Sequence, residues 1–370
     1  MKFTCDKREL VSAIQVVSKA LSSKPSSPIL SGMYLKAEGD SLEIQTTDYE
    51  LGFIVKIPAE VEENGHTVIS GRYMQDVIRR LPGDNVTFTI EYGTNIVNIT
   101  SNQAKFNLKT MNAEDFPTVK IEETRIKFTM KDTVLRNIIK KTIFACSVDD
   151  ARVIFTGCSL TVKGDTLMVA GTNTHRLAFY NHHFDEGVGI EKIIVPHKAL
   201  NEMLSIMKSE IPTDVEVTLT NNKINFQFEN IFFTSRLIEG QFPNFMNSVP
   251  SEFATVVRLK TADFAAAVDR VSLISKANDY NVIRLIFTQG QVHISSNNPE
   301  IGQADEIVEA TVDGPDVNIA FNSNYINDAL KVLDSDEFVF SLNGSLDAAS
   351  IRESEDVNYL YVVTPVRTRN

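Results

Sequence analysis

The sequence predicts an α+β fold of three similar modules, because one pattern of helices and strands recurs along its 370 residues. The opening, Lys2-Phe3-Thr4-Cys5-Asp6, is nearly repeated 125 residues later as Lys127-Phe128-Thr129-Met130-Lys131. Apolar residues at helical spacing follow both openings. An offset of 125 residues matches the size of an ordinary domain and is far longer than a solenoid repeat. We therefore expect about two helices and a larger share of antiparallel strand in each module.

In the first module, Leu10, Ile14 and Val17 lie on one face of the predicted first helix. The prolines of the stretch Ser22–Pro28 prevent this helix from continuing. The remaining predicted elements are hairpin strands at Met33–Lys36 and Leu42–Gln45, joined through Gly39-Asp40, a helix over Gly71–Leu81, and strands at Val86–Ile90 and Ile96–Ile99.

The second and third modules repeat this order. The second has a helix within Lys127–Ile143, where Val134, Leu135, Ile138 and Ile139 are expected to be buried and Arg136 and Lys140 to be exposed. Its other predicted elements are strands at Leu160–Val162 and Leu167–Ala170, a helix over His197–Lys208, and strands at Val215–Thr220 and Ile224–Phe228. The third has helices after Arg258–Lys260 and after Phe321–Tyr325. We predict modules at 1–122, 123–252 and 253–370.

Composition narrows the class of protein. Hydrophobic content of 43% and charged content of 23% are typical of a soluble globular protein. Charged residues interrupt Met1–Leu10, so it does not resemble a signal peptide, and no run approaches the ~20 apolar residues of a membrane helix. We expect a cytoplasmic protein. The net charge of −12 argues against coating nucleic acid with the whole surface, but it permits a local basic lining.

Motifs for catalysis and metal binding are missing. The sequence has no G-x-x-x-x-G-K-[ST], G-x-G-x-x-G, H-E-x-x-H or G-x-S-x-G pattern. The three cysteines form no C-x-x-C pair, which supports neither a disulfide framework nor a zinc site. Neighbouring His182 and His183 would point to opposite faces of a strand. We expect no metal and no cofactor.

The segment Gly171–Phe179 combines hydroxyls, an imidazole and a guanidinium within a few residues. Considered alone, it fits a structural turn as well as a binding site. Its Thr172–Leu177 is similar to the T-x-x-H-R-L motif of the bacterial sliding clamps, the β subunits of the replicative DNA polymerase III. The similarity extends over essentially all of the chain, through the segments Pro28–Leu30, Ala113–Pro117, Gly240–Pro243 and Tyr361–Arg367.

The resemblance implies a DNA clamp fold without catalytic activity. Clamps of this family are head-to-tail homodimers whose six modules form a ring, with helices lining the hole and sheets outside. Their partners are duplex DNA, the DNA polymerase III catalytic subunit, an ATP-driven clamp loader, and other polymerases and repair proteins that carry clamp-binding peptides. Such a protein would act in the nucleoid-associated cytoplasm, with no membrane partner.

The resemblance also implies a peptide-binding groove. On matching positions, its residues are Phe155, Thr172, Thr174, His175, Arg176, Leu177, Pro243, Asn247, Ser248, Asn322, Tyr325, Val362, Thr364, Pro365, Val366 and Arg367. Asn247 replaces a familiar arginine, and Thr364 and Val366 replace common methionines. Because methionine is the more deformable residue, we expect a narrower or less adaptable groove. The last residues, Thr368–Asn370, extend the usual end.

Basic residues on the helices, opposite the apolar faces, are expected to face DNA phosphates. The predicted set is Lys7, Arg8, Lys19, Lys24, Arg72, Arg79, Arg80, Arg136, Lys140, Lys141, Lys198, Lys208, Arg270 and Lys276. Lys24 matches a loop position that contacts DNA in the family, whereas Asp149–Ile154 lacks the polar and aromatic residues of the second such loop. For the dimer interface, we expect Phe106 and Leu108 opposite Leu273 and Ile274.

Two alternatives remain open at the level of sequence. One is a peptide-binding scaffold that does not encircle DNA. The other is a hydrolase that uses His175 and Arg176, although no nucleophile or metal motif accompanies them.

Overall fold

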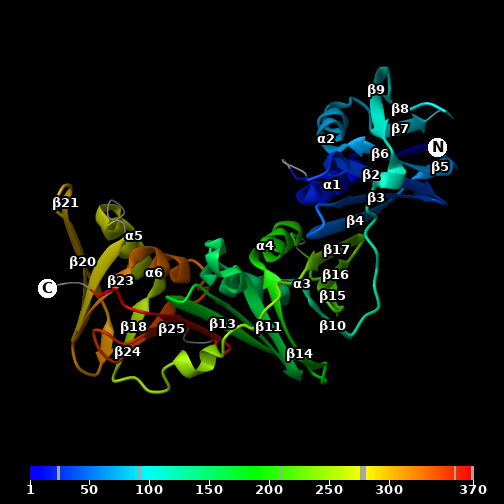
Figure 1. The fold of residues 1–370 in the computed structure, drawn as a ribbon. Coiled ribbons are helices and arrows are strands. Elements are labelled where there is room, and N and C mark those ends of the chain that lie inside the picture. Colours follow the sequence, from blue (N-terminus) through cyan, green and yellow to red (C-terminus); the bar gives the residue numbers. More distant parts are fainter. Residues whose placement is uncertain (23–25, 91–92, 209–210, 276–280, 354–355, 368–370) are drawn as a thin grey trace. The chain divides into compact units, whose positions relative to one another are not determined.

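The computed structural model describes the whole chain except residues 23–25, 91–92, 209–210, 276–280, 354–355 and 368–370 (Figure 1). The structure does not describe the side chain of Ser248 either. Two compact units are present, one made of Met1–Val134 with Glu202–Leu237 and the other of Leu135–Asn201 with Ile238–Asn370. The α-helices are α1 (Lys7–Val17), α2 (Gly71–Arg80), α3 (Asp132–Thr142), α4 (His197–Ile206), α5 (Thr261–Ser275) and α6 (Ser323–Leu330).

The first unit contains a thirteen-stranded antiparallel sheet in the order β10-β15-β16-β17-β4-β3-β2-β6-β9-β8-β7-β1-β5. Its strands are β1 (Lys2–Asp6), β2 (Gly32–Glu38), β3 (Ser41–Thr47), β4 (Leu51–Pro58), β5 (Glu60–Glu63), β6 (Gly65–Ser70), β7 (Asn85–Ile90), β8 (Ile96–Ser101), β9 (Ala104–Met111), β10 (Ile126–Lys131), β15 (Asp214–Leu219), β16 (Lys223–Phe228) and β17 (Ile231–Arg236).

The second unit contains a nine-stranded sheet, β14-β11-β12-β13-β26-β25-β24-β18-β22, and a four-stranded sheet, β21-β20-β19-β23. Its strands are β11 (Gly157–Gly164), β12 (Thr166–Thr172), β13 (Arg176–His183), β14 (Gly189–Pro196), β18 (Thr255–Lys260), β19 (Val282–Thr288), β20 (Gln291–Asn298), β21 (Gly302–Glu309), β22 (Thr311–Asp313), β23 (Val317–Asn322), β24 (Glu337–Leu342), β25 (Ala349–Glu353) and β26 (Tyr359–Val363). Short 3-10 helices lie at Ser18–Ala20, Pro28–Ser31, Ala113–Asp115, Ile143–Ala145, Asp150–Phe155 and Phe245–Ser248.

Helix α1 illustrates how the local sequence produces the fold. The Asp6 carboxylate caps the helix by accepting hydrogen bonds from the backbone N–H groups of Arg8 (2.7 Å) and Glu9 (3.1 Å). Leu10 and Val17 are then buried on one face. In α3 the predicted pattern is confirmed for Leu135, Ile138 and Ile139, which are buried, and for Lys140, which is exposed. It is not met at Val134 and Arg136, which are both intermediate in exposure.

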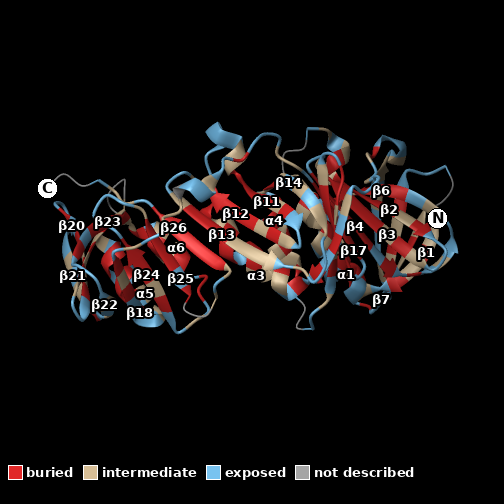
Figure 2. Cartoon of the chain, turned by 90° about the horizontal axis from the view of Figure 1, so that it is seen from below, coloured by how far each residue is buried: buried red, intermediate tan, exposed pale blue. Residues whose placement is uncertain are grey.

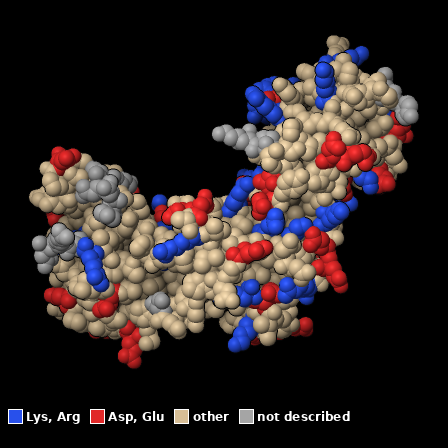
Figure 3. Space-filling view, in the orientation of Figure 1, with Lys and Arg blue, Asp and Glu red and all other residues tan. Residues whose placement is uncertain are grey.

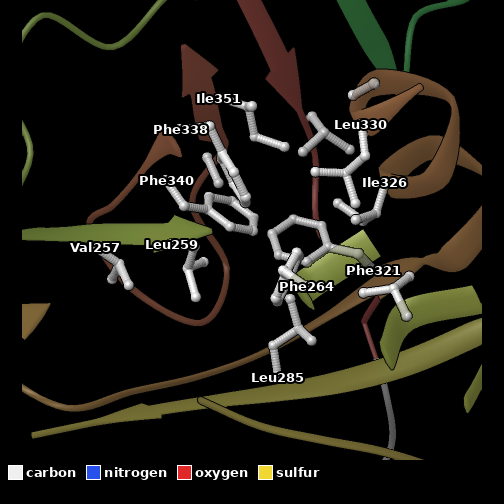
Figure 4. Close-up of a cluster of buried hydrophobic side chains, with 14 of the residues drawn as sticks. Val257, Leu259, Phe264, Leu285, Phe321, Ile326, Leu330, Phe338, Phe340 and Ile351 are labelled. Atoms are coloured by element: carbon white, nitrogen blue, oxygen red, sulfur yellow. The ribbon is translucent and has the colours of Figure 1, made fainter. Parts of the chain in front are cut away.

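An aromatic core stabilises the last third of the chain. Phe264 from α5, Phe321 from β23 and Phe340 from β24 converge in its centre (Figure 4). The ring centroids of Phe321 and Phe340 are 5.8 Å apart, and those of Phe264 and Phe340 are 6.4 Å apart. Buried residues likewise follow β12, β13 and β26 (Figure 2). Close packing of these side chains makes the three strands a rigid support for the residues exposed at their ends.

The α+β class and the repetition of three modules are confirmed. Among the described residues, each module contains two α-helices, and its first hairpin turns at a glycine with positive φ: Gly39 has a φ of 65°, Gly164 a φ of 63° and Gly290 a φ of 83°. Such a conformation is cheap only for glycine. The module boundaries at 122 and 252 stay predictions. The two compact units do not test them, because parts of the second module belong to each unit.

The modules are joined by strand pairing. The last strand of the second module, β17, pairs with β4 of the first, with Phe233 opposite Phe53. The last strand of the third module, β26, pairs in the same way with β13 of the second, with Leu177 opposite Val362. Both pairs are adjacent in Figure 2. The same seam therefore occurs twice within one chain.

Candidate functional site

A cavity of about 250 Å³ opens beside the start of β13 and the end of β26. Most of its lining belongs to the predicted groove: Phe155, Thr172, Thr174, His175, Arg176, Leu177, Pro243, Val362 and Thr364. Sequence reasoning missed three lining residues, Asn244, Phe245 and Ala348. Phe245 could have been predicted, because it closely follows the segment Gly240–Pro243 that matches the family. Nothing in the sequence singled out Ala348.

The turn from Thr172 to Arg176 forms one edge of the cavity. The Thr172 hydroxyl donates to the Arg176 carbonyl (2.6 Å) and accepts from the Thr174 N–H (3.1 Å). The Asn173 amide oxygen accepts from the N–H groups of His175 and Arg176, at 3.0 Å each. Thr174 has a φ of 78°, which is costly for a β-branched residue. The side-chain hydrogen bonds therefore hold a strained turn that leaves His175 exposed at the opening.

Arg176 is fixed as a wall of the cavity. Its guanidinium lies 4.6 Å from the Tyr325 ring centroid and 5.5 Å from that of Phe144, and one nitrogen is 2.8 Å from a carboxylate oxygen of Asp328. It also donates to the Phe144 carbonyl. Only 10% of the side chain is exposed. These contacts use both terminal nitrogens of the guanidinium, whereas its Nε is buried without a hydrogen-bond partner among the described residues. Arg176 therefore shapes the site more than it attracts a distant ligand.

Aromatic and aliphatic side chains form the apolar part of the cavity. The ring centroids of Phe155 and Phe242 are 6.0 Å apart, those of Phe242 and Phe245 are 6.1 Å apart, and those of Phe179 and Phe245 are 5.8 Å apart. Leu177 is buried beside them. An apolar cavity with a few polar groups at its edge suits an apolar side chain from a short peptide.

The cavity is poorly suited to hydrolysis. The Thr172 hydroxyl donates to the Arg176 carbonyl, and the Thr364 hydroxyl donates to the His175 carbonyl at 3.0 Å. Among the described cavity residues, neither hydroxyl is therefore placed as a nucleophile activated by His175. In the described part of the chain, no three His, Cys, Asp or Glu side chains are grouped to hold a metal ion.

The remaining predicted groove residues lie outside the cavity lining. Tyr325 accepts a hydrogen bond from the Asn173 amide (3.2 Å), Asn322 caps α6, and the Val366 N–H donates to the Ala320 carbonyl (2.8 Å). Asn247 and Arg367 are exposed, and Pro365 is partly exposed. The Ser248 side chain lies outside the described residues. These positions stay predicted parts of a longer groove.

The predicted DNA-facing side chains differ in their surroundings. Arg8, Arg72 and Arg79 are exposed on α1 and α2, and Lys198 and Lys208 are exposed on or just after α4. Several others have protein partners: Lys7 donates to the Leu81 carbonyl, Lys19 pairs with Glu202 (3.0 Å), Arg80 with Asp76 (2.7 Å), Lys140 with Asp334 (3.1 Å) and Arg270 with Glu306 (2.7 Å). Arg136 is partly exposed. Lys24 and Lys276 lie outside the described residues. On the face in Figure 3, basic and acidic side chains are interspersed.

The prediction that Lys141 faces DNA is wrong. Its side chain is only 3% exposed, and its ammonium lies 2.9 Å from Glu353 and 3.1 Å from Asp356. Burial alone would lower the pKa of Lys141, but hydrogen bonds to these carboxylates outweigh it and raise the pKa. Adjacent residues on a helix are rotated by about 100°, so Lys141 points to the packed face while Lys140 is exposed.

The predicted interface residues lie near two strand edges. Phe106 on β9 is 40% exposed and Leu273 on α5 is 62% exposed, while Leu108 and Ile274 are partly exposed. In the described structure, residues 104–109 of β9 pair only with β8, and β21 pairs only with β20. One backbone edge of each strand is therefore available for pairing.

Comparison with known proteins identifies the family. Residues 1–120, 129–244 and 246–367 match the N-terminal, central and C-terminal domains of the DNA polymerase III beta subunit. The chain is 31% identical to the beta sliding clamp of Bacillus subtilis and 30% identical to that of Staphylococcus epidermidis, each over 100% of both chains.

Solved structures agree. The DNA polymerase sliding clamp from Bacillus subtilis aligns with a TM-score of 0.96 at 31% identity, and the sliding clamp from Pseudomonas aeruginosa bound to griselimycin aligns with a TM-score of 0.94 at 29% identity. Both alignments cover 100% of each chain. The chain therefore belongs to the DNA polymerase III beta subunit family, the beta sliding clamps.

Proposed function

We propose that this protein is a non-catalytic sliding clamp that encircles duplex DNA as a head-to-tail homodimer. In this role it tethers DNA polymerase III and other replication and repair proteins by their clamp-binding peptides. The observation that carries the proposal is the repeated seam, β17 with β4 and β26 with β13. Strand β9 is the last strand of the first module and corresponds to β17 and β26, whereas β21 of the third module corresponds to β4 and β13. In the described structure, β9 and β21 each lack the partner that forms this seam.

A second copy of the chain supplies both missing partners. If β9 of one copy pairs with β21 of the other, the seam recurs at each junction and the ring closes without an unpaired end. The charges on the two strands are complementary: β9 carries Lys105 and Lys109, whereas β21 carries Asp305, Glu306 and Glu309. Opposite charges favour this pairing over pairing of two like edges.

The exposed cations of α1, α2 and α4 support contact with DNA. They project from the faces opposite the buried apolar residues, and phosphate contacts carry no base sequence information. Non-specific contact of this kind suits a protein that must slide. The segment Asp149–Ile154 supports no such role, because Val153 is 55% exposed there and Asp149 is negative.

Topological retention on DNA tests the proposal. The protein, loaded by an ATP-driven clamp loader onto a nicked circular plasmid, should stay bound through gel filtration and be released once the plasmid is linearised. A ring is held by topology more than by affinity, so circular DNA should retain it even at elevated salt. Equal loss from circular and linear DNA would contradict encirclement and favour a peptide-binding scaffold.

The cavity gives a separate prediction for peptide binding. Replacing Phe245 with alanine should weaken binding of a labelled peptide with leucine and phenylalanine side chains by about 10- to 100-fold, because a central apolar wall is lost. Fluorescence anisotropy measures the change. Met246→Ala is the matched control, because Met246 is the next residue, is 46% exposed and does not line the cavity. Equal affinities of a folded Phe245→Ala variant and the control would rule out this cavity as the peptide site.

A further inference from the structure

Carboxylates of the third module pair with cations that were predicted to contact DNA. The Lys140 ammonium is 3.1 Å from Asp334, and both side chains are substantially exposed, at 44% and 60%. Arg270 makes two hydrogen bonds of 2.7 Å to Glu306. These hydrogen bonds raise the pKa of Arg270 and lower that of Glu306. Each cation thus already has an anionic partner in the protein.

The position of Asp334 is fixed by the buried ion pair of the neighbouring lysine. The Asp334 N–H donates to Glu353 (3.0 Å), and the same Glu353 oxygen accepts from Lys141 (2.9 Å). Asp334 is therefore anchored through its backbone to the same Glu353 that holds Lys141, the residue that follows Lys140. The exposed side chains of Lys140 and Asp334 still have to be ordered when they pair, as in other surface ion pairs.

The surroundings of Asp334 are acidic. It lines a depression of about 720 Å³ together with Asp263, Asp336, Glu337 and Lys260. In this region Lys140 lies at the edge of a negative surface. A phosphate that approaches Lys140 must therefore replace a carboxylate and also come near several further negative charges.

We propose that Asp334 competes with DNA phosphate for Lys140 and so keeps the contact of this part of the clamp with DNA weak. This inference rests on the proposed function, in which α3 lines the DNA channel. When a DNA phosphate replaces the Asp334 carboxylate, the Lys140 ammonium is paired with an anion both before and after. The free energy therefore changes little as the clamp moves from one phosphate to the next. Movement along the duplex is then only slightly hindered at Lys140.

The test compares Asp334→Asn with Glu38→Gln. Both changes remove one negative charge from an exposed Lys–carboxylate pair, but Glu38 pairs with Lys36 (2.6 Å) on strand β2. Asp334→Asn should bind a short linear duplex about 3- to 10-fold more tightly at low salt, since Lys140 gains a phosphate. Its plot of log affinity against log salt concentration should be steeper by about 0.9 for one additional phosphate. Glu38→Gln should match the wild type.

A double variant separates competition from simple repulsion. Lys140→Gln with Asp334→Asn should lose the additional affinity and the additional salt slope. Persistence of the tighter binding without Lys140, or equal behaviour of Asp334→Asn and Glu38→Gln, would overturn the inference. Retention of the wild type on circular DNA is measured in parallel. If that retention is absent, the proposed clamp function fails, whereas if it is present and Asp334→Asn is unchanged, only the role of Asp334 fails.

Discussion

Replacing Lys141 with methionine is expected to lower the free energy of unfolding by about 3–5 kcal/mol. Methionine fills a similar volume but leaves Glu353 and Asp356 without their cation, and these side chains are only 6% and 17% exposed. An uncompensated charge in a buried site is costly. The ammonium also lies 5.4 Å from the Tyr359 ring centroid and 5.8 Å from that of Tyr180, and these contacts are lost as well.

Urea unfolding followed by circular dichroism measures the effect. Lys140→Met is the matched control, because it removes the same charge one residue earlier from an exposed pair with Asp334. That change should cost less than about 1 kcal/mol. Equal loss of stability in the two variants would mean that the buried position of Lys141 has no energetic consequence, contrary to our expectation.

The stability difference between the wild type and Lys141→Met should depend on pH in the alkaline range. The folded protein raises the pKa of Lys141 above its usual 10.5. A group with a raised folded pKa contributes its full stability below the unfolded pKa and loses it as pH rises through the folded pKa. The difference should therefore be constant from neutral pH up to about 10 and shrink above that.

Replacing Phe106 with glutamate is expected to shift the proposed dimer to monomers, with an increase in the dimer dissociation constant of about 100-fold or more. The change removes an exposed apolar side chain from β9 and adds a negative charge where the acidic strand β21 is proposed to pair. Sedimentation velocity over a range of protein concentrations measures the dissociation constant. Retention on circular DNA should be lost in the same variant.

Ile190→Glu provides the control for Phe106→Glu. Ile190 is 80% exposed on β14, which is not part of the proposed interface, so its replacement should leave the dimer intact. Adding Glu309→Lys, at an exposed position of β21, to Phe106→Glu should restore part of the affinity by removing the clash of like charges. A Phe106→Glu protein that remains as dimeric as Ile190→Glu would exclude β9 from the interface.

Much of the fold was predictable because the same local sequence patterns recur in each module. Gly39 and Gly164 form equivalent turns, and the apolar spacing of α1 and α3 defines their buried faces. The turn at Thr172 was predictable for a related reason, since its hydrogen bonds connect residues within a few positions of one another.

Other parts depend on contacts between distant segments. Ala348 reaches the cavity because β25 pairs with β26, with Ala349 opposite Val363. No local sequence pattern predicts that pairing. Lys141 was misassigned for a similar reason. The helical pattern separates it from Lys140, but only the packing of Glu353 against α3 decides that its face is buried.

The repeated seam has a consequence for assembly. A series of units joined by identical steps is a polymer in which the step angle alone decides between a closed ring and an open filament. Strand pairing fixes that angle through many backbone hydrogen bonds, so small changes in twist at β4–β17 or β13–β26 would alter how the two ends meet. We therefore expect mutations at these internal seams, which contain no residue of β9 or β21, to convert the proposed ring into an open fibre without weakening any single junction.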